Sequence, residues 1–153
     1  MQNAEGMIGL RRFTEDDAEI IRQNQYPSES LDGIREMIRA WRSEEFTGKR
    51  FEMLALTSSE AVVGCVSLYE CSKSAASIGM EIFDGERRKG YASAAMKLLL
   101  ARAKAQGYKL ILDQVSTGNA PSKALHEKLG FETDGYIYRN AKGREVLLYL
   151  YCL

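Results

Sequence analysis

Strand-like and helix-like patterns of apolar residues alternate along this chain and predict a mixed α/β (α+β) fold. The expected architecture is a mixed central sheet of about seven strands with about four helices. Strands are predicted at residues 7–12, 51–57, 62–70, 77–83, 109–115, 131–139 and 144–152, and helices at 14–25, 28–45, 91–106 and 120–128.

The strongest periodicity lies in residues 91–106, where Ala92, Met96, Leu99 and Ala103 form one apolar stripe of a helix. An apolar strand precedes this helix and another follows it. Strand, helix and strand in this order form a βαβ unit. The fourth strand (77–83) and the fifth (109–115) are therefore expected to be parallel neighbours with a right-handed crossover.

Two antiparallel features frame this unit. The strands at 51–57 and 62–70 are separated by a short polar turn and are expected to form a hairpin. Gly64 within the second strand indicates a bulge. The last two strands, 131–139 and 144–152, flank the turn Asn140-Ala141-Lys142-Gly143.

The turn between the fourth strand and its helix is basic and contains glycine. Arg87, Arg88 and Lys89 precede Gly90, after which the helix begins. Unpaired N–H groups and the helix dipole favour an anion at a helix N-terminus, and glycine permits close backbone approach. The turn lacks the Gly-Lys-Ser/Thr order of a Walker loop and the three glycines of a Rossmann loop. The sequence therefore predicts a phosphate site of another kind.

Composition bounds the function. A length of 153 residues suits one domain over residues 1–153. Lys+Arg and Asp+Glu both total 21, which argues against nucleic acid as the main partner. No apolar run is long enough to cross a membrane, and residues 1–5 lack the features of a secretion signal. Cys65, Cys71 and Cys152 have no metal-binding spacing. We therefore expect a cytoplasmic protein without a metal site.

Two motifs resemble those of the GNAT N-acetyltransferases. The stretch 87–92, Arg-Arg-Lys-Gly-Tyr-Ala, is similar to the Gln/Arg-x-x-Gly-x-Gly/Ala loop that binds the pyrophosphate of acyl-CoA, although many relatives have a second glycine at position 88. The stretch 119–131 is similar to the second motif, Asn-x-x-Ala/Ser followed by Leu-x-Glu-x-Leu-Gly-Phe, at seven positions. The predicted βαβ unit lies between them.

The resemblance implies an acetyl-CoA site in a cleft where the fourth and fifth strands splay apart. Backbone N–H groups of residues 88–92 would hold the pyrophosphate, and the pantetheine arm would pair with backbone of the fourth strand. A backbone N–H near position 81 or 82 would stabilise the oxyanion. The implied binding set is Ile82, Phe83, Arg87, Arg88, Lys89, Gly90, Tyr91, Ala92, Asn119 and Ser122.

Two residues are candidates for proton transfer. His126 occupies the second-motif position where many relatives have a tyrosine acid, and its ordinary pKa suits transfer near neutral pH. The alternative for His126 is a helix residue without a catalytic role. Glu81 stands in an apolar strand where some relatives place a general base, and its alternative is a solvated strand face.

The resemblance thus implies direct transfer of an acetyl group from acetyl-CoA to a primary amine of a small molecule or a protein N-terminus. A catalytically inactive GNAT-fold module that binds acyl-CoA is the first alternative, and a nucleotide-dependent phosphotransferase is the second. The form Leu-His-Glu-x-Leu-Gly-Phe resembles acetyltransferases of phosphinothricin and amino-acid analogues. Residues 138–146 resemble the corresponding stretch of acetyltransferases that act on ribosomal-protein N-termini. The acceptor and the oligomeric state, a homodimer included, are left open.

Overall fold

A computed structural model describes residues 7–153 of the chain. The expectations about the N-terminal signal and about one domain over 1–153 extend to residues 1–6, which lie outside the described residues. The elements in chain order are β1 (Ile8–Arg12), a 3₁₀ turn η2 (Glu15–Asp17), α1 (Ala18–Gln25), α2 (Leu31–Trp41), β2 (Glu45–Phe46), β3 (Lys49–Ser58), β4 (Ala61–Glu70), β5 (Ala75–Ile82), η3 (Asp84–Glu86), α3 (Tyr91–Ala105), β6 (Leu110–Ser116), α4 (Ala120–Lys128), β7 (Ile137–Arg139) and β8 (Glu145–Cys152).

The described strands form one mixed sheet, in which the order is β1-β3-β4-β5-β6-β8-β7 and β2 pairs with β3. This confirms the predicted mixed sheet. The expected parallel pair is β5 and β6, and every other pairing among the described strands is antiparallel.

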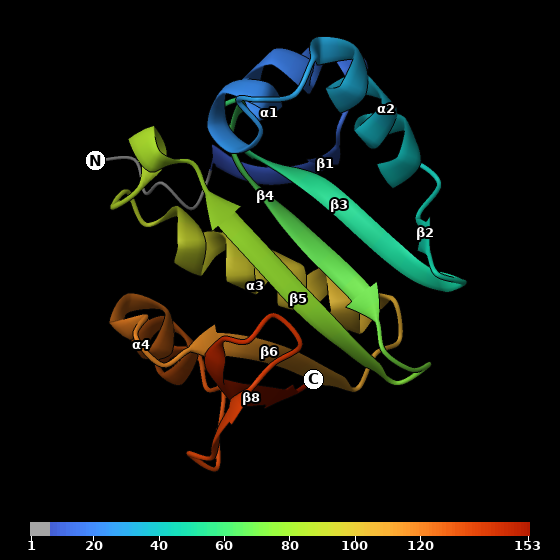
Figure 1. The fold of residues 1–153 in the computed structure, drawn as a ribbon. Helices are drawn as coiled ribbons and strands as arrows, with labels where there is room; N and C mark the ends of the chain where they lie inside the picture. Colours follow the sequence, from blue (N-terminus) through green and yellow to red (C-terminus); the bar gives the residue numbers. More distant parts are fainter. Residues whose placement is uncertain (1–6) are drawn as a thin grey trace.

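The parallel contact is short, because it joins Ala75, Ala76 and Ser77 to Leu110, Ile111 and Leu112 and then ends. The rest of β5 and β6 diverges toward the carboxyl ends (Figure 1). The predicted splay is therefore present.

Helices cover both faces of the sheet (Figure 1). The helices α1 and α2 pack on one face with Phe13, Phe83 and part of β4. On the other face α3 packs through Ala95, Met96 and Leu99. Alternation along β5 directs Ile78, Met80 and Ile82 to the α3 face and the odd-numbered residues to the α1 and α2 face.

The predicted bulge is present at Gly64. The register between β3 and β4 shifts between Leu56 and Thr57, and Val63 is the extra residue. A β-carbon on Gly64 would lie 2.2 Å from the backbone oxygen of Glu81 on β5. The glycine therefore lets β4 approach the end of β5, beyond the part of β5 that pairs with β6.

Several predicted elements differ from the structure. The helix predicted at 14–25 is the 3₁₀ turn η2 followed by α1. The second helix is α2, shorter than 28–45 because the Ser30 side chain caps it by accepting from the Gly33 N–H. The short β2 was not predicted, although Thr47 and Gly48 have the two positive φ angles of a hairpin turn. The strand at 131–139 is wrong for most of its length: Glu132 makes an isolated bridge with Leu150, and only β7 is a strand.

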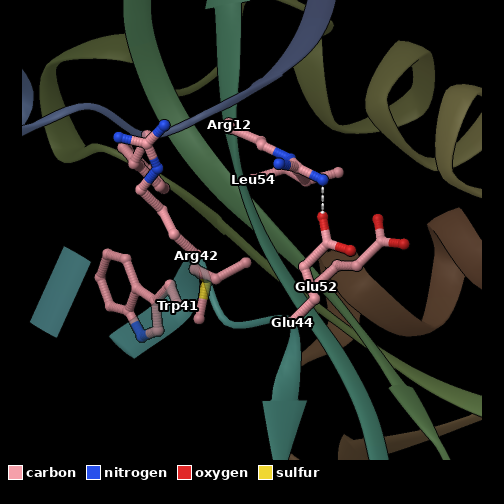
Figure 2. A pocket seen from close by; sticks show the side chains of 8 residues that line it. Arg12, Trp41, Arg42, Glu44, Glu52 and Leu54 are labelled. Atoms are coloured by element: carbon pink, nitrogen blue, oxygen red, sulfur yellow. Dashed lines mark hydrogen bonds and ion pairs between the residues drawn. The ribbon is translucent and has the colours of Figure 1, made fainter. Parts of the chain in front are cut away.

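A hollow of about 10 Å³, on the scale of one water molecule, lies between β1, α2 and β3 (Figure 2). An ion pair between Arg12 and Glu44 crosses it. Glu52, which also lines the hollow, is 1% exposed and accepts from Arg102 and Gln106, and these bonds fix the end of α3 to β3. None of the lining residues belongs to the predicted site. Within residues 7–153, no helix is long and apolar enough to span a membrane.

Candidate functional site at the carboxyl edge of the parallel strands

Two helix N-termini meet the sheet where β5 and β6 separate. Eight residues separate β5 from α3, and three residues separate β6 from α4. Because parallel strands have their carboxyl ends at the same edge, both motifs lie at that edge. Ligands of open α/β sheets bind at this kind of position.

The loop into α3 has the backbone shape of a glycine-rich anion site. Gly90, the N-cap of α3, has φ +82°. Arg88 has φ +64°, so an arginine holds the left-handed conformation that a second glycine would adopt without strain. A β-carbon on Gly90 would meet nothing within 4 Å, so the helix start has open space beside it.

Backbone donors in this loop are available to a ligand. Within the described chain, the N–H groups of residues 87–91 have no acceptor. No acidic residue lies in the first turn of α3 to neutralise its positive end. Tyr91 packs against the α3-side core and fixes the helix start. The loop thus fits a phosphate group.

The three cations of the loop are not equivalent. Arg87 pairs with Asp84 at 3.0 Å and Lys89 pairs with Glu86 at 2.8 Å, both as exposed i,i+3 pairs. The guanidinium of Arg88 has no ion pair or hydrogen bond with any described residue. Arg88 is therefore the side chain of this loop that is free to bind an anion.

The end of β5 offers backbone groups toward the gap. The Phe83 N–H donates to Val63 of β4 at 2.9 Å. Antiparallel alternation therefore turns the N–H of Ile82 away from β4, to the side that β6 has left. The carbonyl of Ile82 accepts from Arg87 Nε at 3.2 Å, and the Phe83 side chain is buried. The backbone here is fixed, and one N–H is free for a ligand.

Glu81 lies exposed on the α1 and α2 face of β5. Its carboxylate accepts a hydrogen bond of 2.9 Å from the amide of Gln25, the last residue of α1. The same amide lies 3.3 Å from the sulfur of Cys65 on β4. Burial raises the pKa of the Cys65 thiol to about 11, so this thiol stays protonated at neutral pH.

His126 is placed differently. It is 2% exposed, and its ring contacts Phe131 and Tyr149. Nδ1 lies 2.7 Å from the carbonyl oxygen of Ser122, and Nε2 lies 2.6 Å from Oδ2 of Asp113 on β6. A carbonyl only accepts, so Nδ1 carries a proton. Both ring nitrogens are therefore engaged within the protein.

The pair of His126 and Asp113 holds a proton tightly. Burial disfavours the charged ring, but the hydrogen bonds to Asp113 and to the Ser122 carbonyl outweigh it, and the pKa of His126 is raised. Burial also raises the pKa of Asp113, against the opposing effect of His126. The two groups titrate as a unit.

The two catalytic candidates lie on opposite faces of the sheet. The parallel register places Ile111 beside Ala76 on the α3 face, so Asp113, two residues on, shares that face. Asp113 holds His126 there, whereas Glu81 lies on the α1 and α2 face. The structure does not bring the two side chains together, and the gap between β5 and β6 separates them. Their predicted catalytic roles stay predictions.

The second-motif residues begin α4. Asn119 is its N-cap, as predicted, and its side-chain oxygen accepts from the Ser122 N–H at 3.1 Å. The Ser122 hydroxyl lies 3.4 Å from Nδ1 of His126. Asn119 is exposed and keeps its amide N–H groups for other partners. The motif thus shapes the start of α4 at the same edge.

Sequence reasoning missed two partners of the candidates. Gln25 ends the helix predicted at 14–25, and Glu81 is 56 positions away from it in the sequence. Asp113 lies within the strand predicted at 109–115, where an acidic residue among aliphatic ones needs a partner. That requirement was the one available signal for the contact with His126.

Comparisons with known proteins agree with this geometry. The model of the family described as "Acetyltransferase (GNAT) domain" matches residues 7–132. The chain therefore belongs to the GNAT acetyltransferase family.

Three similar proteins show the range of the family. The SPbeta prophage-derived uncharacterized N-acetyltransferase YokL of Bacillus subtilis is 28% identical over 103 residues, 65% of this chain and 58% of that protein. The L-methionine sulfoximine/L-methionine sulfone acetyltransferase of Pseudomonas aeruginosa is 40% identical over 52 residues, 34% of this chain and 30% of that protein. The matched segments thus span about half and about a third of these relatives.

The third is a solved structure, that of Mycobacterium smegmatis RimJ in complex with CoA-disulfide. It is 18% identical, with 97% of this chain and 83% of that chain covered, and superposes with a TM-score of 0.82. At this identity the likeness concerns the fold.

Proposed function

We propose that this protein is an acetyl-CoA-dependent N-acetyltransferase that transfers the acetyl group directly to a primary amine. The observation that carries the proposal is the early end of the β5–β6 pairing, with a left-handed basic loop at the same edge. Family membership and the CoA-disulfide complex of the RimJ neighbour support the choice of acyl-CoA.

The proposed binding residues are mainly those whose backbone N–H groups or side chains have no partner among the described residues. The N–H groups of residues 88–92 and the Arg88 side chain would hold the pyrophosphate of acetyl-CoA. The backbone of Ile82 and Phe83 would border the pantetheine arm in the gap. Asn119 and Ser122 would border this arm from α4. Arg87 and Lys89 are paired with Asp84 and Glu86, so they would contribute less positive charge to this site than Arg88.

The chemistry requires a base and a stabilised oxyanion. An amine acceptor is charged at neutral pH and must lose a proton before it attacks the thioester carbonyl. Glu81, oriented by Gln25, would take that proton directly or through water. The N–H of Ile82, which faces away from β4, would stabilise the carbonyl oxygen while the C–N bond forms and the C–S bond breaks. The nitrogen loses its second proton as the amide forms, and this proton passes to the departing thiolate.

The protonated thiol of Cys65 fits direct transfer, because an acyl-cysteine intermediate requires a thiolate. The proposal therefore places no covalent intermediate on this residue. In direct transfer the acceptor and the thioester are bound at the same time, and they would approach each other from opposite faces of the sheet.

One observation favours the inactive acyl-CoA-binding module as the second candidate. The ring of His126, at the family's acid position, is bound on both sides by Asp113 and Ser122. In this alternative the loop binds acyl-CoA, and no proton donor completes the transfer.

The test combines thermal melting with thiol release. Melting is measured with acetyl-CoA, free CoA and ATP. A ligand at about 100 times its dissociation constant stabilises the fold by roughly 2.7 kcal/mol. Thiol release is then followed with a panel of primary amines. A shift with acetyl-CoA and amine-dependent thiol release support the enzyme. A shift without release from any amine favours the binding module, and no shift with either CoA species contradicts both.

A further inference from the structure

A second hollow, of about 260 Å³, lies beside the carboxyl end of β6. This volume is slightly below the ~300–1,000 Å³ of pockets for drug-sized ligands, so it suits a small molecule or one end of a larger one. Its lining residues come from β6, β8 and the turn between β7 and β8: Gln114, Ser116, Asn140, Ala141, Lys142, Arg144 and Val146.

The hollow opens on the same sheet face as Glu81. Leu112 is the last residue of β6 paired with β5, beside Ser77, and it shares a face with that residue. Gln114 and Ser116 follow by alternation on this face, beyond the point where the strands part. Glu81 lies four residues after Ser77 on β5, on the same face. The hollow and the proposed base therefore border the gap from neighbouring strands.

The lining carries two positive charges and no carboxylate. Neither the ammonium of Lys142 nor the guanidinium of Arg144 has an ion pair or hydrogen bond to any residue in the described part of the chain. The nearby acid Glu145 does not line the hollow and faces Arg139 at 3.6 Å. The hollow thus has uncompensated positive charge.

The turn that carries the two cations is fixed rather than loose. The Asn140 side-chain oxygen accepts from the N–H groups of Lys142 and Arg144, at 3.0 and 3.1 Å. Its amide donates to Gln114 of β6 at 3.1 Å. One asparagine therefore sets the turn and ties it to the strand that borders the gap, which pre-organises the cations.

The geometry points to a carboxylate-binding subsite: the acceptor amine carries a carboxylate, which Arg144 and Lys142 bind while its amino group lies toward Glu81. Guanidinium groups bind carboxylates through two parallel hydrogen bonds, and an ammonium adds a point charge. The position of the amine near Glu81 rests on the proposed function. The binding of a carboxylate rests on the lining of the hollow alone.

The same charges disfavour a polyamine acceptor, because like charges would repel it from this side of the gap. A zwitterionic acceptor of amino-acid size has both groups that the site requires, an amine for transfer and a carboxylate for binding. The inference therefore assigns the substrate class as amino-acid-like amines.

The first experiment measures binding without turnover. The side-chain amide signals of Gln114 and Asn140 are followed by NMR during titration with N-acetyl-L-methionine and with its methyl ester. We expect the acid to shift both signals and the ester to leave them unchanged. Arg144→Gln and Lys142→Gln should each weaken binding of the acid about tenfold. Lys104→Gln, a matched loss of charge in the last turn of α3, should leave it unchanged.

The second experiment measures thiol release from acetyl-CoA with L-methionine, L-methionine methyl ester and spermidine. We expect Arg144→Gln to raise KM for L-methionine about tenfold and to leave KM for the ester and for acetyl-CoA unchanged.

The outcomes separate the two proposals. Carboxylate-dependent binding without thiol release from any amine supports the subsite and contradicts the proposed function. Equal binding of acid and ester, or binding of the acid that neither substitution weakens, overturns the subsite. Thiol release that is as efficient with the ester or with spermidine as with L-methionine also overturns it, while the transferase stands.

Discussion

The side-chain amide of Gln25 donates a hydrogen bond to the carboxylate of Glu81 across 2.9 Å and so links the end of α1 to β5. This contact holds an exposed acid in one orientation beside the gap between β5 and β6. A carboxylate oriented in this way can accept a proton from an incoming amine.

Replacement of Glu81 tests this role. In Glu81→Gln the side chain keeps its shape and loses its basicity, so we expect kcat to fall by roughly 10²-fold or more. The dissociation constant of acetyl-CoA should not change, because Glu81 lies outside the binding set. Thiol-release kinetics and acetyl-CoA titration measure the two effects.

The control is Glu36→Gln, which removes an exposed carboxylate from α2 and should leave kcat unchanged. Gln25→Ala keeps the base and removes its hydrogen bond, so it should reduce kcat less than Glu81→Gln. An unchanged kcat in Glu81→Gln would assign the base to another group.

Arg88 has a strained backbone conformation and an unpaired guanidinium group. Its left-handed φ of +64° costs a non-glycine residue about 1–2 kcal/mol. Arg88→Gly removes this strain, whereas Arg88→Ala keeps it, and both remove the charge. We expect Arg88→Gly to be about 1 kcal/mol more stable than Arg88→Ala in urea unfolding. Both should bind acetyl-CoA more weakly than the unmodified chain.

Arg88→Ala and Arg88→Gly serve as controls for each other, because both lack the charge and they differ in backbone freedom. Unfolding free energies that are equal within error would show that the loop relaxes away from the left-handed conformation. Unchanged acetyl-CoA affinity in both would remove Arg88 from the binding set.

Gly64 is required by the close approach of β4 to β5. In Gly64→Ala the new β-carbon would lie 2.2 Å from the backbone oxygen of Glu81, which is too short for any contact. Because the obstacle is backbone, the strands must shift, and we expect a loss of about 1–3 kcal/mol in unfolding free energy. Thermal and chemical denaturation measure this loss.

Gly85→Ala provides the comparison, since a β-carbon there would meet nothing within 4 Å and its φ is not positive. That variant should be close to the unmodified chain in stability. If both variants have the same stability, the bulge accommodates a side chain and the close approach carries no constraint.

The buried pair of His126 and Asp113 predicts a pH dependence of stability. The folded-state pKa of His126 is raised above its ordinary value of about 6.5. The contribution to folding is therefore fully present below about pH 6.5 and is lost as the pH rises through the folded-state pKa. His126 is the one histidine of the chain.

Unfolding free energies measured between pH 5.5 and 9 check this sign, because the range begins below the ordinary pKa of histidine and extends above it. In His126→Gln the part of the decline that comes from the imidazole should disappear. Parallel curves for the variant and the unmodified chain would contradict the raised pKa. Retained thiol release in the same variant would remove His126 from the catalytic residues.

Much of the candidate site could be predicted because its signals are local. The loop at 87–92 and the helix after it lie within one continuous stretch, and the Asn119 cap follows from residue type and spacing. The Gly64 bulge was also predictable, because glycine inside a strand has few other uses. Each of these features depends on residues close together in sequence.

The predictions failed where side-chain hydrogen bonds to backbone compete with regular structure. The strand predicted through residues 131–139 breaks because Asp134 accepts from the Tyr136 N–H and Gly135 has φ +78°. The Asp-Gly pair was the available signal, and the apolar residues on either side outweighed it.

Contacts between distant residues were beyond reach for a different reason. Periodicity places a side chain on a face of its own element, but it does not say which residue of another element lies opposite. Glu81 and Gln25 meet through the packing of α1 on the sheet, and His126 and Asp113 meet through the packing of α4. Only the assembled fold defines such pairs.

The short joint between β5 and β6 has a mechanical consequence. Three residue pairs hold these strands, whereas seven pairs hold β4 to β5 and seven hold β6 to β8. The sheet is therefore weakest across its own middle, and amide hydrogens there should exchange fastest among the central strands. A molecule bound in that gap would contact both β5 and β6 and so hold the two halves of the sheet together. The lifetime of the folded protein in a cell would therefore depend on the supply of that molecule.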